Sequence, residues 1–182
     1  MTMSALTSNP SNLDLLQSTK FHVVFDRLPG ITYFCQSANL PGISLTEIPI
    51  PTPFVELYAP GEKAIYDTFN ITFLVDENLK AWTELHDWIR AITFPTDFKE
   101  YRELPRLSKS SNIRSFNDRP APYSDGIMTV YTNKNNPQFR VKLIDMFPTS
   151  VGSLVFSVSD TAENIVTADA TFRFTYFNYE RI

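Results

Sequence analysis

Residues 48–61 read Ile48-Pro49-Ile50-Pro51-Thr52-Pro53-Phe54-Val55-Glu56-Leu57-Tyr58-Ala59-Pro60-Gly61. Proline lacks an amide donor and biases the preceding residue towards extended backbone, so three prolines at alternate positions resist helix and disfavour a central strand. An edge strand or a protruding hairpin remains. The apolar side chains would make an exposed arm prone to aggregation unless another surface covers it. We therefore predict a protruding arm that contacts another subunit, through Ile48, Pro49, Ile50, Pro51, Pro53, Phe54, Val55, Leu57 and Tyr58.

The composition favours one domain rich in β-structure. A chain of 182 residues suits a single domain with one core, so residues 1–182 are interpreted as one unit. Aromatic residues make up 14% of the chain, which favours strands over helical bundles. We expect a mainly β (α+β) fold, namely a small β-barrel or sandwich of about eight strands with one flanking helix.

Two segments depart from this pattern. Residues 1–15 begin with a stretch rich in Ser, Thr and Asn and are interpreted as a flexible N-terminal arm. Residues 93–125 contain four prolines and are interpreted as a long loop insertion, within which residues 99–119 carry a net charge of +3. Because the whole chain has a net charge of −4, the remainder carries −7. This asymmetry indicates either a solvated loop or a partner-binding loop on an acidic body.

The sequence predicts no targeting or membrane-spanning segment. Residues 1–12 contain neither Lys nor Arg and no apolar core of signal-peptide length. No apolar run reaches the length needed to cross a membrane. We therefore expect a soluble chain that does not insert into a membrane.

Alternation of apolar and polar residues places the first strands. Residues 20–25 predict a strand, Leu28-Pro29-Gly30 predicts a turn, and residues 31–38 predict the returning strand of a hairpin. A further extended piece leads into the arm. The clearest strand covers residues 67–75, where an apolar series alternates with Thr and Asn at Phe69, Ile71, Phe73 and Val75.

One amphipathic helix is predicted over residues 77–92, with Asp76 as its cap. Its apolar residues repeat at helical spacing, at Leu79, Trp82, Leu85 and Ile89, with Trp88 and Ile92 broadening the stripe. Strands resume over residues 126–132 and 138–147, joined by a turn at 133–137. A turn at 148–152 then leads into two predicted strands, 153–159 and 165–179.

Few residues could carry chemistry. His22 and His86 are the only histidines, neither lies at metal-ligand spacing to another strong ligand, and no common catalytic or phosphate-binding motif is present. Glu84 and Asp87 share a helix face, where such carboxylates more often solvate the surface. Cys35, the only cysteine, is interpreted as a small buried side chain rather than a nucleophile. We therefore predict no catalytic residue, no cofactor, no metal site and no enzymatic activity.

Several short motifs follow one another in a recognisable order: Phe34-Cys35-Gln36 with Ala38, Leu40-Pro41-Gly42-Ile43, Glu47-Ile48-Pro49, Gly61, Asp67-Thr68-Phe69, Asp76-Glu77, Asp87-Trp88 and Phe147-Pro148-Thr149-Ser150-Val151-Gly152. In this order they resemble the tail tube proteins of T-even-type contractile-tailed bacteriophages, over residues 20–95 and 138–180. The likeness rests on the ordered set, since no single motif is as specific as a metal-binding signature. Residues 93–125 are longer than the usual connection, and the N-terminal arm has no counterpart.

The resemblance implies a structural virion protein. It implies that six copies form a ring, that rings stack into the hollow inner tube of a contractile tail, and that DNA passes through without sequence-specific binding. The implied partners are further copies of the chain, the sheath protein, the baseplate tube initiator and the tape measure protein. The implied location is the phage tail, after assembly in the host cytoplasm. Residues 48–61 correspond to the arm that packs on neighbouring subunits.

A conduit for DNA needs a wall to which phosphates do not bind, because each contact from Lys or Arg strengthens binding. We therefore expect acidic or neutral polar residues on lumen-facing strands, and the basic segment 99–119 on the outside. Two alternatives remain. A tube protein of a related contractile injection system, such as a tailocin or a type VI secretion system, would have the same fold. A monomeric ligand-binding β-barrel would instead enclose a cavity.

Overall fold

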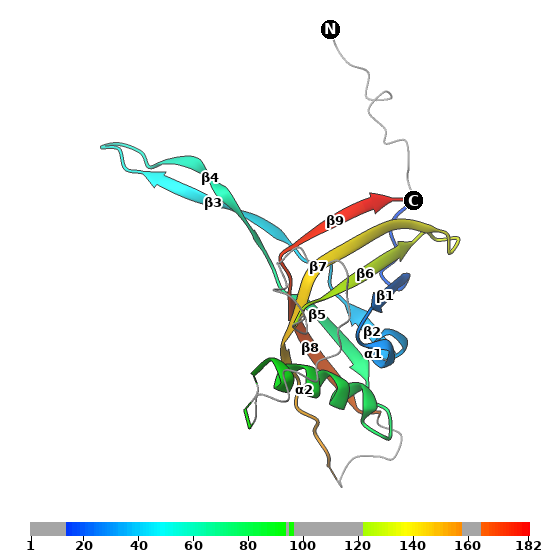
Figure 1. Ribbon diagram of the computed structural model, residues 1–182. Coiled ribbons are helices and arrows are strands. Elements are labelled where there is room, and N and C mark those ends of the chain that lie inside the picture. The colour runs from blue at the N-terminus through cyan, green and yellow to red at the C-terminus, as the bar shows by residue number, and fades with distance from the viewer. Residues whose placement is uncertain (1–13, 94, 97–121, 158–164) are drawn as a thin grey trace, which may run out of the picture.

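The computed structural model describes residues 14–93, 95–96, 122–157 and 165–182 (Figure 1). The predicted N-terminal arm up to residue 13, and residues 97–121 of the predicted loop with its basic segment, lie outside the described residues. The described chain forms nine strands and two helices: β1 (Phe21–Phe25), α1 (Pro29–Phe34), β2 (Cys35–Ala38), β3 (Ile43–Ile50), β4 (Leu57–Tyr66), β5 (Phe69–Leu74), α2 (Lys80–Thr93), β6 (Ser124–Tyr131), β7 (Pro137–Val151), β8 (Thr167–Arg173) and β9 (Tyr176–Arg181).

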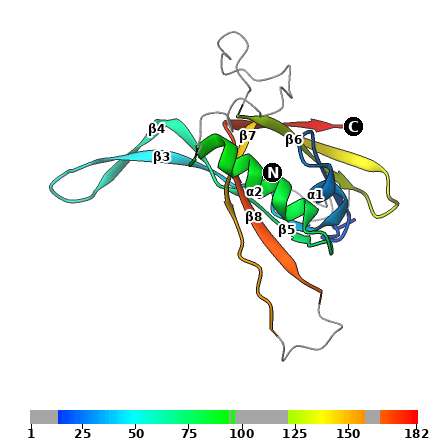
Figure 2. The same ribbon diagram turned by 60° about the horizontal axis from the view of Figure 1, so that its bottom comes forward.

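The long strand β7 belongs to two antiparallel sheets. Its first part pairs with β6 on one side and, up to Ile144, with β9 on the other, whereas its last part pairs with β8 from Phe147 onward. The strand order is β1-β6-β7-β8-β5-β2, and this path does not close into a barrel among the strands that the structure describes. The predicted mainly β class is confirmed, as an open arrangement of two sheets with α2 beside them (Figure 2).

A bend at Asp145 lets β7 change sheets. Asp145 is buried and has a φ of 53°, in the left-handed region that non-glycine residues rarely adopt. Its backbone amide donates to Asp125 Oδ1 at 3.3 Å, which holds the bend in place. Strands that switch sheets turn corners through bends or bulges of this kind. The bend at Asp145 therefore lies where β7 passes from one sheet to the other, after its last pair with β9 at Ile144 and before its first pair with β8 at Phe147.

The core lies between the two sheets and α2, and Phe172 is at its centre. Its ring centroid lies 5.4 Å from that of Phe25 in β1, 6.4 Å from Phe69 in β5 and 6.4 Å from Trp88 in α2. Phe172 itself has no exposed surface. One side chain of β8 thus ties together a strand of the other sheet, a neighbouring strand and the helix.

The helix α2 begins at Lys80, three residues later than predicted, because the chain first makes a turn. Leu79 has a φ of 54°, and its amide donates to the Asp76 carbonyl at 2.9 Å. Asp76 Oδ1 accepts from the amide of Ala81 at 3.2 Å, so Asp76 still serves the helix start. The residues of α2 that the fold buries are Ala81, Leu85 and Trp88, whereas Leu79, Trp82 and Ile89 of the predicted stripe are half-buried.

The predicted hairpin of residues 20–25 with 31–38 is wrong. Residues 29–34 form the short helix α1, since Pro29 fits the first helical position and Ile31 is buried. Thr32 reinforces this turn, because its hydroxyl donates to the Leu28 carbonyl at 3.2 Å and accepts from the Phe25 amide at 3.0 Å. β1 pairs instead with β6, and β2 pairs with β5.

The C-terminal strands also differ from the prediction. β7 continues through the predicted turn at 148–152 as far as Val151, with an irregularity between Pro148 and Ser150. Residues 153–157 of the next predicted strand form no strand. The last predicted strand is divided into β8 and β9, and the amide of Thr175 donates to the Ile144 carbonyl where the chain crosses between sheets. Because β8 and β9 pair with different parts of the bent strand β7, the chain is also interrupted between β8 and β9.

Candidate functional site

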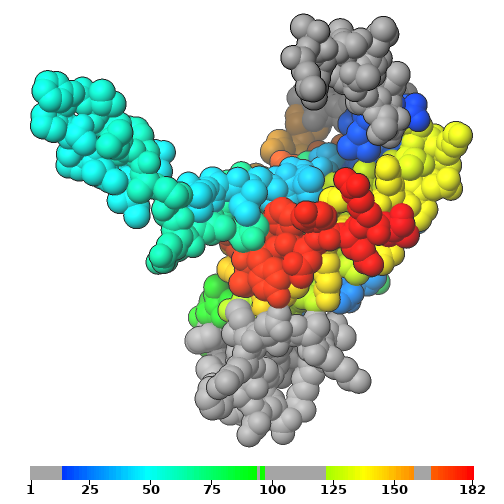
Figure 3. Space-filling view, turned by 90° about the horizontal axis from the view of Figure 1, so that it is seen from above, coloured from blue at the N-terminus to red at the C-terminus, as the bar shows by residue number. Residues whose placement is uncertain are grey.

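The most prominent feature of the surface is a β-hairpin that projects from the body (Figure 3). β3 and β4 pair antiparallel as a separate two-stranded sheet, from Ile43↔Tyr66 at the base to Ile50↔Leu57 near the tip. The hairpin therefore covers residues 43–66 and extends well beyond the predicted arm at 48–61. Pro49 lies in β3 opposite Tyr58, whereas residues 51–56 form the tip. From here on, "the hairpin" means residues 43–66.

All nine residues predicted for a subunit interface are exposed and lie on the hairpin. Among its exposed large apolar side chains the exposed fraction runs from 46% at Ile50 to 96% at Phe54. The sequence reasoning missed three further exposed apolar residues of the hairpin, Ile43, Leu45 and Ile65. The alternation of apolar and polar residues that begins at Ile43 could have indicated a longer arm. A gathering of exposed apolar side chains on one projecting element is typical of a protein-protein contact.

The tip is shaped locally by Thr52. Its hydroxyl accepts a hydrogen bond from the Val55 amide at 3.2 Å and donates to the Val55 carbonyl. A side-chain bond of this type closes a turn, and the flanking prolines fix their own φ angles near the value such turns use. The tip residues are therefore held in position before any partner binds.

A bulge at Gly61 interrupts the hairpin ladder. The register shifts between Leu45 and Glu47, where β4 contains two extra residues. A Cβ atom at Gly61 would lie 2.6 Å from the carbonyl oxygen of Thr46, closer than real Cβ atoms approach backbone. Glycine is therefore required at the bulge, which bends and twists the hairpin on its way out from the body.

The base of the hairpin is fixed to the body by aromatic packing. The ring of Tyr66 in β4 lies 5.7 Å from Phe174 and 5.4 Å from Phe177, measured between centroids, and those two rings are 6.2 Å apart. Arg173 Nη1 also donates to the Tyr66 carbonyl at 3.2 Å. These contacts attach the base of the hairpin to the segment between β8 and β9. The base is therefore held in a fixed position on the body.

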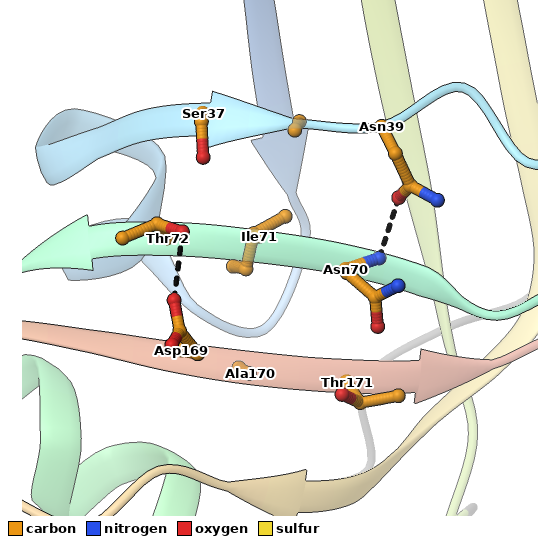
Figure 4. A pocket seen from close by; sticks show the side chains of 9 residues that line it. Ser37, Asn39, Asn70, Ile71, Thr72, Asp169, Ala170 and Thr171 are labelled. Carbon is orange, nitrogen blue, oxygen red and sulfur yellow. Dashed lines mark hydrogen bonds between the residues drawn. The ribbon is translucent and has the colours of Figure 1, made fainter.

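A second surface feature is a shallow polar groove across β2, β5 and β8 (Figure 4). Thr72 Oγ1 donates to Asp169 Oδ1 at 2.7 Å, and the amide of Asn70 donates to Asn39 Oδ1 at 2.6 Å. The groove has a volume of about 450 Å³, and Asp169 is the one charged residue among those that line it: Ser37, Ala38, Asn39, Asn70, Ile71, Thr72, Asp169, Ala170 and Thr171. This face of the sheet is polar and nearly neutral.

Among the residues considered for chemistry, His86 and Asp87 lie together on α2, whereas His22 lies on β1 and Cys35 on β2. His22 is exposed on β1. His86 is half-buried, stacks on Trp82 at 5.2 Å between centroids, and has its Nδ1 3.3 Å from Asp87 Oδ1. Burial raises the pKa of the Cys35 thiol to about 11, which keeps it protonated and a poor nucleophile near neutral pH. Within the described ranges, no group of three or more His, Cys, Asp or Glu residues could hold a metal ion.

The helices give no membrane span. Among the described residues, neither α1 nor α2 is long and apolar enough to cross a bilayer. The two surfaces described above are the apolar hairpin and the polar groove. An apolar projection suits assembly with other chains.

Comparison with solved structures shows where this fold occurs. The tube-terminating cap of the anti-feeding prophage has a TM-score of 0.60 at 15% identity, covering 99% of this chain and 100% of that chain. The sheath-tube complex of an extracellular contractile injection system, PVC, in its extended state gives 0.53 at 13% identity, with 100% of both chains covered. The sheath/tube terminator of the PVC system gives 0.55 at 14% identity, covering 91% and 96%. The chain shares its fold with these proteins.

Comparison of the sequence itself gives the family. No curated protein sequence matches the chain significantly. The family defined as phage tail tube protein, in contrast, matches residues 10–180. This match covers both sheets, the hairpin and α2, and the family indicates a structural role in the tail of the virion. The chain belongs to the phage tail tube protein family.

Proposed function

We propose that six copies of this chain close into a ring through the hairpin, and that the rings stack into the inner tube of a contractile tail. The observation that carries this proposal is the hairpin, whose apolar side chains from Ile43 to Ile65 stay exposed in the single chain. Exposed apolar surface of this extent is stable in solution only when a partner covers it. In a tube built of one protein, that partner is another copy.

Sheath and baseplate are the proposed outer partners. Solved structures with this fold come from a sheath-tube complex, a tube-terminating cap and a baseplate, which supports a tube of this chain that starts on a baseplate initiator and lies inside a sheath. The tape measure protein fills the lumen before DNA, and DNA then passes through without sequence-specific contacts. A tube of a tailocin or a type VI secretion system would use the same fold, and the family match favours the phage tail.

Electron microscopy of the purified chain tests the ring proposal. We expect end-on views of rings or tubes with sixfold symmetry, because a contact between two different patches of one chain generates closed rings when the rotation closes. Sheath and baseplate should not be needed for ring formation. A monodisperse monomer, or rings with a different symmetry, would contradict the proposal.

The polar face of β2, β5 and β8 is the surface that we propose lines the lumen. Its groove residues offer hydroxyls, amides and the single carboxylate of Asp169, so a passing phosphate backbone meets no cation there. Arg173, the last residue of β8, donates instead to the Tyr66 carbonyl at the hairpin base. The other sheet carries cations, with Arg140 3.9 Å from Glu180 and Lys142 3.2 Å from Asp125. That second sheet suits contacts with protein better than a DNA conduit.

An Asp169→Lys substitution tests the lumen proposal. Each ring would then present one cation per subunit to the DNA, so ejection from particles carrying the variant should be slower, and higher salt should relieve the delay. The matched control is Thr83→Lys, which adds the same charge at an exposed position of α2. Fluorescence of a DNA dye outside the capsid follows ejection. Equal ejection kinetics for the two variants would show that the polar face does not line the lumen.

A further inference from the structure

Asp169 is an exposed carboxylate of the polar groove, and the chain holds it in one orientation. It lies on β8 directly opposite Thr72 of β5, whose hydroxyl donates to Asp169 Oδ1 at 2.7 Å (Figure 4). Its neighbours along the strand, Ala168 and Ala170, are buried in the core, which fixes the backbone beneath the carboxylate. Among the described residues, no donor bonds the second oxygen, so Asp169 Oδ2 can accept from a ligand.

The charge of Asp169 is not balanced by a neighbouring cation. Within the described ranges, no Lys or Arg forms an ion pair with Asp169. The cation at the end of the same strand is Arg173, and the rise of a β-strand places the two residues roughly 13 Å apart. This separation exceeds the screening length of about 8 Å at physiological salt. The groove therefore keeps a negative charge that a cationic ligand can neutralise.

The other polar groups of the groove add hydrogen-bond acceptors. The side-chain amide of Asn39 is used within the chain, because it accepts from the Asn70 amide at 2.6 Å and donates to the Thr68 carbonyl at 3.0 Å. Asn70 Nδ2 donates to Thr68 Oγ1 at 3.4 Å, so its Oδ1 is the end of the side chain that can accept from a ligand. The hydroxyls of Ser37 and Thr171, which also line the groove, can accept as well. A group with several N–H donors finds partners here, whereas an anion does not.

The size and chemistry of the groove suit the head group of Lys or Arg. Its volume of about 450 Å³ lies within the range of ~300–1,000 Å³ that small-ligand sites have. A guanidinium or ammonium group carries several N–H donors and no acceptor. Hydrogen bonds from such a cation to a carboxylate are shorter and stronger than those between neutral groups. The combination of Asp169 with surrounding acceptors therefore selects a basic side chain.

In the proposed tube this groove faces the lumen, and every subunit repeats it. The protein that fills the lumen before DNA then lies along equivalent carboxylates in each ring. One exposed ion pair changes an affinity by up to about fivefold. Contacts that one elongated protein makes with many rings act together, so their combined effect is much larger. DNA phosphates are repelled by the same charge.

We propose that the polar groove binds Lys or Arg side chains of the protein that fills the lumen, with Asp169 as their ion-pair partner. Thr72 is a positioning residue, since its hydrogen bond orients the carboxylate. This inference rests on the proposed function and adds the chemistry by which the lumen wall recognises its protein cargo. The same carboxylate holds a basic protein in the tube and keeps the DNA that follows from binding to the wall.

Co-sedimentation of purified tubes with a labelled peptide tests this site. The probe is a flexible peptide of serine and glycine with arginine at regular intervals, and its counterpart has glutamate in place of arginine. Wild-type tubes should bind the arginine peptide and not the glutamate peptide. Asp169→Asn should lower the affinity about tenfold or more, because the peptide loses its contacts with several subunits together. Asp87→Asn, which removes an exposed carboxylate of α2, is the charge-matched control and should bind like the wild type.

Microscopy of the same samples separates this inference from the proposed function. Asp169→Asn keeps an oxygen that can accept from Thr72, so its tubes should look like those of the wild type. Thr72→Val keeps the charge but not the hydroxyl, and should lower the affinity by a smaller factor than Asp169→Asn. Equal affinities of wild-type and Asp169→Asn tubes, or an equal loss in Asp87→Asn, would overturn the inference while the tube itself stands. If the chain forms no tubes, the proposed function fails and the inference with it.

Discussion

Deletion of residues 51–59 is expected to give a soluble, folded protein that forms no tubes. The deletion removes the exposed apolar residues of the tip and its flank, Phe54, Val55, Leu57 and Tyr58. It leaves Glu47 paired with Pro60, so residues 48–50 become a three-residue loop, which lies within the usual length of hairpin connections. The core around Phe172 is remote from the change, so the unfolding temperature should hardly move. Negative-stain microscopy shows whether tubes form, and thermal unfolding of the same sample gives the unfolding temperature.

A matched pair of substitutions tests whether the effect on tube formation is specific to the hairpin or common to any exposed apolar side chain. Phe54 at the tip is 96% exposed and Phe156, outside the hairpin, is 74% exposed. Phe54→Ser should shorten or abolish tubes, whereas Phe156→Ser should have a smaller effect, since only the first lies on the proposed contact. Normal tubes from the 51–59 deletion would refute the assembly role of the tip.

Replacing Phe172 by alanine is expected to lower the free energy of unfolding by about 3–5 kcal/mol. The ring is completely buried and contacts Phe25, Phe69 and Trp88, which come from three different elements. These rings belong to separate strands and a helix, so they cannot all move into the cavity. A domain of this size has a total stability of about 5–15 kcal/mol, so the variant should be close to unfolding at physiological temperature. Urea denaturation followed by tryptophan fluorescence provides the measurement.

The same substitution at an exposed phenylalanine provides the control. Phe54→Ala should change the free energy of unfolding by no more than about 0.5 kcal/mol, because little apolar surface is buried there in the single chain. Phe172→Ala and Phe54→Ala therefore have opposite profiles: the first loses stability and the second loses assembly. A cost below about 1 kcal/mol for Phe172→Ala would mean that Phe172 does not hold the two sheets and α2 together.

The elements with long, regular periods could be predicted from the sequence. The alternation of Phe69, Ile71 and Phe73 indicated β5, and all three side chains are buried. The helical spacing that begins after Asp76 indicated α2, although the left-handed turn at Leu79 delays its start. These patterns are local consequences of burial on one face, so they can be read without knowing the partner elements.

The sheet crossings could not be predicted, because they depend on partners distant in sequence. The apolar alternation continues through Phe174 and Tyr176, so nothing local marks the break between β8 and β9. The break exists because β7 bends at Asp145 and the two strands pair with different parts of it. The helix α1 was missed for a different reason: with six residues it is too short for a helical period, and Pro29 fits a turn as well.

The hairpin could be predicted in its chemistry but not in its extent. Spaced prolines and apolar side chains pointed to a projecting arm at residues 48–61, and these residues form its outer part. The inner part was missed because the bulge at Gly61 shifts the register and hides the pairing of Leu45 with Ala64. The contact between the hairpin and another subunit stays a prediction.

A cryo-electron-microscopy structure of assembled tubes tests the central claim most directly. We predict that Phe54, 96% exposed in the single chain, is buried against another copy. Hairpins that project into solvent from a complete tube, with Phe54 still exposed, would contradict the account.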